Sequence, residues 1–146
     1  MVEAELTGNP FAHFLLARDS AGKQAASAPV VAYLCFWVVF EEVRLMNLAV
    51  IEPKRRSGIA TALVTAALQT GYSQTATRAV LEVRSSNTAA QALYSKFGFR
   101  RVSVRTQYYS NPIEDAVLME LDPITAEAVS NPSERQPSGG VTQTLQ

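Results

Sequence analysis

The chain has 146 residues, of which 47% are hydrophobic, and its 13 Lys and Arg residues balance its 13 Asp and Glu residues. A chain of this length can build one hydrophobic core, so we expect a single domain. The neutral charge excludes the basic field that drives direct nucleic-acid binding, and one cysteine with one histidine leaves no metal-ligand cluster and no internal disulfide.

The first third of the chain has the composition of three consecutive strands. A strand is predicted at 11–18, and strands at 29–40 and 44–50 follow it in an antiparallel meander. The run at 29–40 is the most apolar, but its twelve residues are fewer than the 18 or more of a membrane helix, so it indicates a buried strand. The first ten residues show no secretory signal, and we expect a cytoplasmic protein.

The middle of the chain alternates helices and strands. Helical periodicity over 58–71 predicts the first helix, and a short strand follows at 79–84. A second helix is predicted at 87–97, because Asn87 is a good N-cap and a glycine follows the last turn. The final strands are predicted at 100–108 and 116–122.

These elements describe an α/β fold, a mixed sheet with one layer of helices. Residues 123–146 are rich in Ser, Pro, Gly and Gln and lack apolar periodicity, so we expect a domain of residues 1–122 and a disordered tail. In such folds, ligands bind at strand-to-helix junctions, and the chain has two of them.

The first junction is a basic loop, KRRSG, that leads into the first helix. Free N–H groups at a helix start attract phosphate, and Gly58 lets a ligand approach because it has no Cβ. The segment 56–61 therefore predicts a pyrophosphate cradle, although it is neither a Walker loop nor a GxGxxG fingerprint. A basic surface turn with a glycine at the helix entry has the same pattern.

The second junction, LEVRSSNTAAQALYSKFGF, carries a carboxylate and a phenol twelve residues apart. Strand alternation turns Glu82 away from the face on which Leu81 and Val83 pack. Asn87 and Tyr94 are seven residues apart and share one helix face. The three side chains can gather around one ligand, or they can be a solvated strand residue, a helix cap and a packed aromatic ring.

These two junctions carry a resemblance to a known family. The run RRSGIA, Arg55 to Ala60, fits the (Q/R)-x-x-G-x-(G/A) loop of the GNAT acyltransferase superfamily, where main-chain amides hold the pyrophosphate of acetyl-CoA. With NLAV, LEVRSSNTAAQALYSKFGF, the YY pair at 108–109 and EDAVLM, the chain resembles more narrowly the RimI-like ribosomal-protein-alanine N-acetyltransferases of bacteria. The likeness runs from about Phe11 to Leu121, and it implies a GNAT fold and acetyl-CoA as co-substrate.

The resemblance also implies roles for individual residues. Glu82 would be the general base, Tyr94 the general acid, and a main-chain N–H of Val50 the oxyanion donor. An N-terminal α-amine, with a pKa of about 8 against about 10.4 for lysine, needs only a moderate base. The residues implied to bind the cofactor are Leu48, Ala49 and Val50 at the pantetheine, Asn87 at the CoA arm, and Arg56, Ser57, Gly58, Ile59, Ala60 and Thr61 at the pyrophosphate.

The chain departs from this family in two places. Its relatives begin with a strand and one or two helices, and because only MVEAELTGN precedes the first predicted strand, we expect most of these elements to be missing, through a truncation or a mis-assigned start. The loop between Pro53 and Gly58 is one residue short, which puts full CoA affinity in question. A hypothesis for the peptide entrance is that it is bordered by Tyr108, Tyr109, Glu114 and Asp115.

Three function classes remain open at this stage. The first is an N-acetyltransferase for a protein N-terminus, by resemblance the alanine terminus of a small-subunit ribosomal protein. The second is a GNAT enzyme for a small amine or an antibiotic, and the third is a non-catalytic CoA-binding module. In each case we expect a monomer or weak dimer with no membrane contact.

Overall fold

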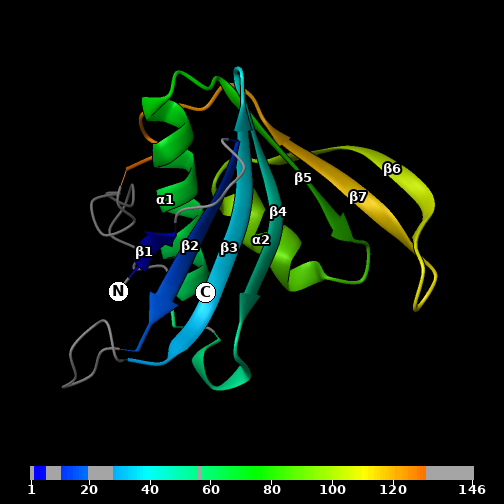
Figure 1. The fold of residues 1–146 in the computed structure, drawn as a ribbon. Coiled ribbons are helices and arrows are strands. Elements are labelled where there is room, and N and C mark those ends of the chain that lie inside the picture. The colour runs from blue at the N-terminus through cyan, green and yellow to red at the C-terminus, as the bar shows by residue number, and fades with distance from the viewer. Residues whose placement is uncertain (1, 6–10, 20–27, 56, 131–146) are drawn as a thin grey trace, which may run out of the picture.

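The computed structural model describes residues 2–5, 11–19, 28–55 and 57–130. One seven-stranded sheet runs through them in the order β1-β2-β3-β4-β5-β7-β6 (Figure 1). The elements in chain order are β1 (Val2–Glu5), β2 (Ala12–Arg18), β3 (Val30–Val39), β4 (Glu42–Val50), the 3₁₀ turn η2 (Glu52–Lys54), α1 (Ile59–Ser73), β5 (Arg78–Arg84), α2 (Thr88–Lys96), β6 (Arg100–Tyr109) and β7 (Glu114–Leu121).

The predicted fold class is confirmed, with one strand more than the sequence indicated. β1 pairs antiparallel with β2, from Val2 opposite Ala17 to Glu5 opposite Phe14. A short first strand is therefore present, and residues 6–10, which follow it, lie outside the described residues.

Both helices lie on the same face of the sheet. Val43, Ala79 and Leu121 are neighbours across β4, β5 and β7, so their side chains share one face. A Cβ placed at Gly71 in α1 would overlap Val43, and one placed at Gly98, after α2, would lie 3.2 Å from Leu121. The opposite face, called the open face below, is covered by neither α1 nor α2.

The core extends past the expected end of the domain. Ile124 and Ala128 are 5% and 7% exposed and belong to the same cluster as the strands and helices. The main-chain N–H of Ile124 donates to the carbonyl of Thr77 at 2.7 Å. Residues 123–130 thus pack on the domain instead of starting the tail, because two apolar side chains suffice to anchor so short a segment. Residues 131–146 lie outside the described residues.

Neither α1 nor α2, the helices within the described part of the chain, combines the length and the apolar character needed to cross a bilayer.

Candidate active site

The parallel ladder between β4 and β5 stops early. It runs from Glu42 opposite Arg78 to Leu45 opposite Leu81. At that point β4 contains an extra residue, Met46, because Leu45 pairs with Phe36 and Asn47 with Cys35 on β3. A bulge bends its strand, and β4 and β5 diverge beyond it (Figure 1). The end of this ladder is where the two halves of the sheet separate.

The free edge of β4 faces the place where the strands diverge. The N–H of Ile51 donates to the carbonyl of Val31 on β3. Because antiparallel backbone groups alternate in direction, the main-chain groups of Leu48 and Val50 turn away from β3, and those of Ala49 turn towards it. The carbonyl of Val50 accepts a hydrogen bond from Arg55 Nε at 3.1 Å. An extended ligand arm can therefore pair with Leu48 and Val50, while Ala49 can contribute only its side-chain face.

The predicted phosphate cradle lies at the other end of that edge. α1 starts directly after Gly58, whose φ is +85° and whose missing Cβ would meet no atom within 4 Å. The N-cap residue Gly58 makes no side-chain hydrogen bond, and the positive end of the helix dipole lies at this helix start. Ile59 and Ala60 are half-buried and the Thr61 side chain is buried, so their contribution would come from main-chain groups. Ser57 donates to the carbonyl of Lys54, and Arg56 lies outside the described residues.

Glu82 is the first residue of β5 beyond the ladder, and it points to the open face as predicted. Its side chain is 20% exposed and lies 3.8 Å from Arg105 Nη1. The Tyr108 phenol also bonds this carboxylate, and that bond, with the charge of Glu82 and desolvation, raises the pKa of Tyr108 against the opposing charges of Arg105 and Arg44. The base candidate is therefore held between a cation and a phenol from β6.

Tyr94 lies on the helical face and is only 6% exposed. Its ring centroid is 5.6 Å from that of Phe99, and burial raises its pKa to about 12. Gly98 lies beside Leu121, which pairs with Ala79. Tyr94 precedes Gly98 by four residues, a helical rise of about 6 Å. Two residues of a strand rise by about the same distance, so Tyr94 lies near the level of Leu81, two residues after Ala79. Among the described residues its hydroxyl has no hydrogen-bond partner, a state that a bound ligand would resolve.

Glu82 and Tyr94 thus lie at the same end of the ladder but on opposite faces of the sheet. A reactive group placed where β4 and β5 diverge would have the carboxylate on the open side and the phenol on the helical side. Such an arrangement suits direct transfer between two substrates that arrive from opposite faces. It needs no covalent intermediate, and Cys35, half-buried in β3, has no role in it.

Asn87 caps α2. Its Oδ1 accepts the N–H of Ala90 at 3.1 Å, and its side chain is exposed. The cap was predicted from sequence, and the amide nitrogen remains on the surface for a ligand contact.

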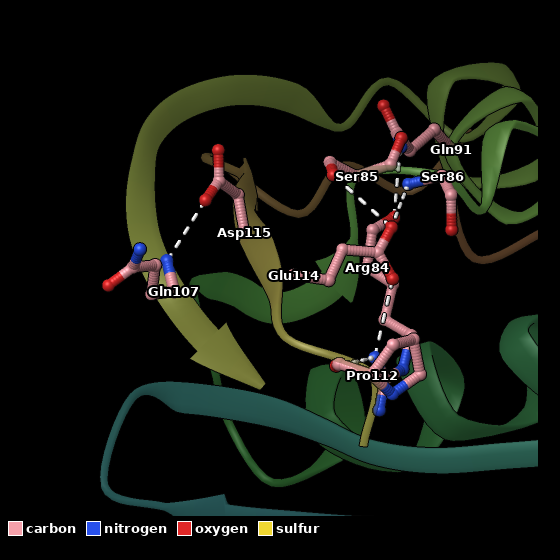
Figure 2. A network of polar contacts seen from close by, with 8 residues as sticks. All are labelled: Arg84, Ser85, Ser86, Gln91, Gln107, Pro112, Glu114 and Asp115. Atoms are coloured by element: carbon pink, nitrogen blue, oxygen red, sulfur yellow. Dashed lines mark hydrogen bonds and ion pairs between the residues drawn. The ribbon is translucent and has the colours of Figure 1, made fainter. Parts of the chain in front are cut away.

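The turn between β5 and α2 is held by a carboxylate from β7 (Figure 2). Glu114 accepts the N–H of Ser86 at 2.6 Å, the hydroxyl of Ser85 at 3.3 Å and Nη1 of Arg84 at 3.3 Å. Hydrogen bonds from Ser86 are the largest cause of its lowered pKa, with desolvation acting in the opposite direction. Asp115 accepts the N–H of Gln107 at 2.9 Å. Both carboxylates therefore bind the protein's own groups, and their place at the border of a peptide entrance stays a prediction.

Sequence reasoning missed the residues that surround Glu82. Arg105 and Tyr108 reach it from β6, which is separated from β5 by β7. Arg84 lies over the ring of Tyr109, 4.3 Å from its centroid. The YY pair was the available signal, but its link to Glu82 depends on the β6–β7 register, which is shifted between Arg105 and Tyr109. A metal-ligand group of three His, Cys, Asp or Glu side chains does not occur within the described ranges.

The chain is similar to known acetyltransferases. The acetyltransferase (GNAT) family pattern matches residues 2–99. A Bacillus subtilis protein named putative ribosomal protein bS18-alanine N-acetyltransferase is 32% identical over 115 residues, which are 79% of this chain and 72% of that protein. The crystal structure of the ribosomal-protein-S18-alanine N-acetyltransferase from Escherichia coli superposes with a TM-score of 0.66 at 32% identity, covering 82% of this chain and 72% of that one.

A more distant structure shares the fold alone. Arabidopsis thaliana NAA60, solved in complex with acetyl-CoA, has a TM-score of 0.70 at 19% identity and covers 78% of this chain and 77% of that one.

Proposed function

This chain belongs to the acetyltransferase (GNAT) family, and from that premise we propose that it transfers the acetyl group of acetyl-CoA to the α-amine of a protein N-terminus. The acceptor we propose is the N-terminal alanine of a small-subunit ribosomal protein, because the relatives at 32% identity are named for that substrate. The same proposal includes a cytoplasmic location and a monomer or weak dimer.

One observation carries the proposal. Glu82 and Tyr94 flank the end of the β4–β5 ladder from opposite faces, and a free strand edge leads from there to a helix start suited to phosphate. A cofactor with a pyrophosphate, a long arm and a terminal thioester fits such a line of groups. Leu48 and Val50 would pair with the arm, Ser57 to Thr61 would hold the pyrophosphate with Arg56, and Asn87 would contact the arm near its end.

The residues have distinct roles in the transfer. Glu82 takes a proton from the amine nitrogen as that nitrogen bonds the thioester carbon, and the N–H of Val50 stabilises the oxyanion. When the carbon–sulfur bond breaks, Tyr94 donates a hydrogen bond and then a proton to the sulfur, and it regains its proton from solvent. With a pKa raised to about 12 by burial, Tyr94 stays protonated at neutral pH and so carries a proton for the leaving sulfur.

The test is turnover with defined acceptors. We expect the full chain to acetylate the α-amine of an alanine-starting peptide and to leave polyamines and aminoglycosides untouched. Glu82→Gln should lower kcat by about 10²- to 10⁴-fold, the range for losing a general base, with acetyl-CoA binding unchanged. Glu120→Gln is the matched control. Glu120 lies on the same sheet face as Glu82, two residues along β7 from Leu118, the residue that pairs with Glu82.

Two other outcomes would replace this function. Turnover of small amines but of no peptide would assign the chain to the second class of GNAT enzyme. Binding of acetyl-CoA without turnover of any amine, unchanged in Glu82→Gln and Tyr94→Phe, would identify a CoA-binding module.

A further inference from the structure

The open face carries an exposed apolar patch. It consists of Phe14, Tyr33 and Trp37, which are 37%, 40% and 37% exposed. Each of the two β3 members lies between buried neighbours that face the helices, so the patch residues point to the opposite side.

Strand register makes these residues neighbours. Phe14 pairs with Cys35, and Tyr33 and Trp37 lie two positions to either side of Cys35 on β3. Such diagonal positions are about 7–8 Å apart, within reach of aromatic side chains. The patch is therefore contiguous across β2 and β3.

No element in the described part of the chain covers the patch. Both described helices, α1 and α2, pack on the other face. Large exposed apolar side chains gathered in one place are uncommon on a monomer and indicate an interaction site.

The position of Glu82 indicates what lies on the patch. Glu82 is on the same face, and three strand spacings separate β5 from β2, or at least about 14 Å at about 4.8 Å per strand, because β4 and β5 diverge beyond the ladder. An extended peptide rises about 3.3 Å per residue, so about four residues span this distance. No Asp or Glu occurs in β2, in β3 or in the Arg44–Val50 part of β4. The carboxylate on the path from the patch to β5 is therefore that of Glu82, and a carboxylate is the group expected to receive an amine.

We propose that the acceptor chain lies extended across the open face, with its amine at Glu82 and apolar side chains at about its third to fifth positions on the patch. The substrate class is thus a polypeptide N-terminus followed closely by apolar residues. This inference rests on the proposed function, because it takes Glu82 as the group that receives the amine.

Two matched hexapeptides test it, Ala-Gly-Leu-Leu-Leu-Gly and Ala-Gly-Ser-Ser-Ser-Gly, with the dipeptide Ala-Gly as the short reference. We expect a KM about five- to tenfold lower for the leucine peptide than for the serine peptide, with similar kcat, as expected for burying a few half-exposed side chains. Trp37→Ala should remove this preference and leave the KM of Ala-Gly unchanged. Tyr72→Ala, at a 46% exposed position on α1, should retain the preference.

Fluorescence separates this inference from the proposed function. Trp37 is the single tryptophan of the chain, so its emission reports on the patch without turnover. A blue shift with the leucine peptide but not with the serine peptide is expected. If that shift occurs without acetylation, the proposed function fails and the docking surface stands. If both hexapeptides are acetylated with equal KM, or if sedimentation shows a dimer that Trp37→Ala dissociates, the open face is not an acceptor surface and the inference is overturned.

Discussion

Tyr94→Phe should change how the stability of the protein responds to alkaline pH. The phenol is 6% exposed and its pKa is raised to about 12 by burial, against 10.0 for a free tyrosine. Below pH 10 the side chain is neutral in both the folded and unfolded states. As the pH rises from 10 to 12, the unfolded chain ionises first, so the wild type loses stability in this window.

The size of the loss follows from the two pKa values. A difference of two units corresponds to about 2.7 kcal/mol when the titration is complete, and to about 1.3 kcal/mol between pH 9 and pH 11. Urea unfolding at these two pH values measures it, and the difference between wild type and Tyr94→Phe removes the contribution of other groups. We expect the variant to lose about 1.3 kcal/mol less than the wild type.

Tyr72→Phe controls for the removal of a phenol at an exposed site. If Tyr94→Phe lost as much stability as the wild type over this range, the hydroxyl would be solvated in the folded protein. The assignment of Tyr94 to the helical side of the ladder would then be wrong.

Gly58→Ala should cost about 1 kcal/mol in urea unfolding because φ is +85°, and calorimetry should show weaker acetyl-CoA binding. Gly71→Ala should lower stability by about 1–3 kcal/mol because its Cβ overlaps Val43, and Val43→Ala in the same chain should recover part of the loss. Glu114→Gln should destabilise most at neutral pH. Hydrogen bonds from Ser86 lower the pKa of Glu114, so the folded protein loses the stability that the carboxylate contributes as the pH falls through 4.5 and below. The difference in unfolding free energy between wild type and Glu114→Gln should shrink over that range.

Local patterns predicted most elements, because each depends on residues close in sequence. The meander followed from apolar runs, α2 from the Asn87 cap, and its end from Gly98, which has a φ of +102°. β1 was missed because its four residues are too few to show the alternation of a strand. Residues 123–130 were missed because two apolar side chains do not make a period.

The candidate site was likewise predictable from the sequence only in part. Glu82 and Tyr94 could be chosen from their types and spacing, and the open-face direction of Glu82 followed from alternation. Their position on opposite faces of one ladder end could not, because it depends on where β4 leaves β5, and that is set by a bulge at Met46. The hydrogen bonds of Glu114 could not be predicted for a similar reason, since its partners lie 28 to 30 residues away.

In our proposal, the groups that carry out acetyl transfer and the apolar patch that binds the acceptor belong to different parts of the sheet. The groups proposed to bind acetyl-CoA and move protons belong to β4, β5, α1 and α2, which share one continuous core. None of them lies on β2 or β3, so a change in the apolar patch leaves the geometry for transfer intact. The physical expectation is a chain whose kcat is set at the end of the β4–β5 ladder and whose KM is set by the acceptor's own apolar residues on an exposed sheet.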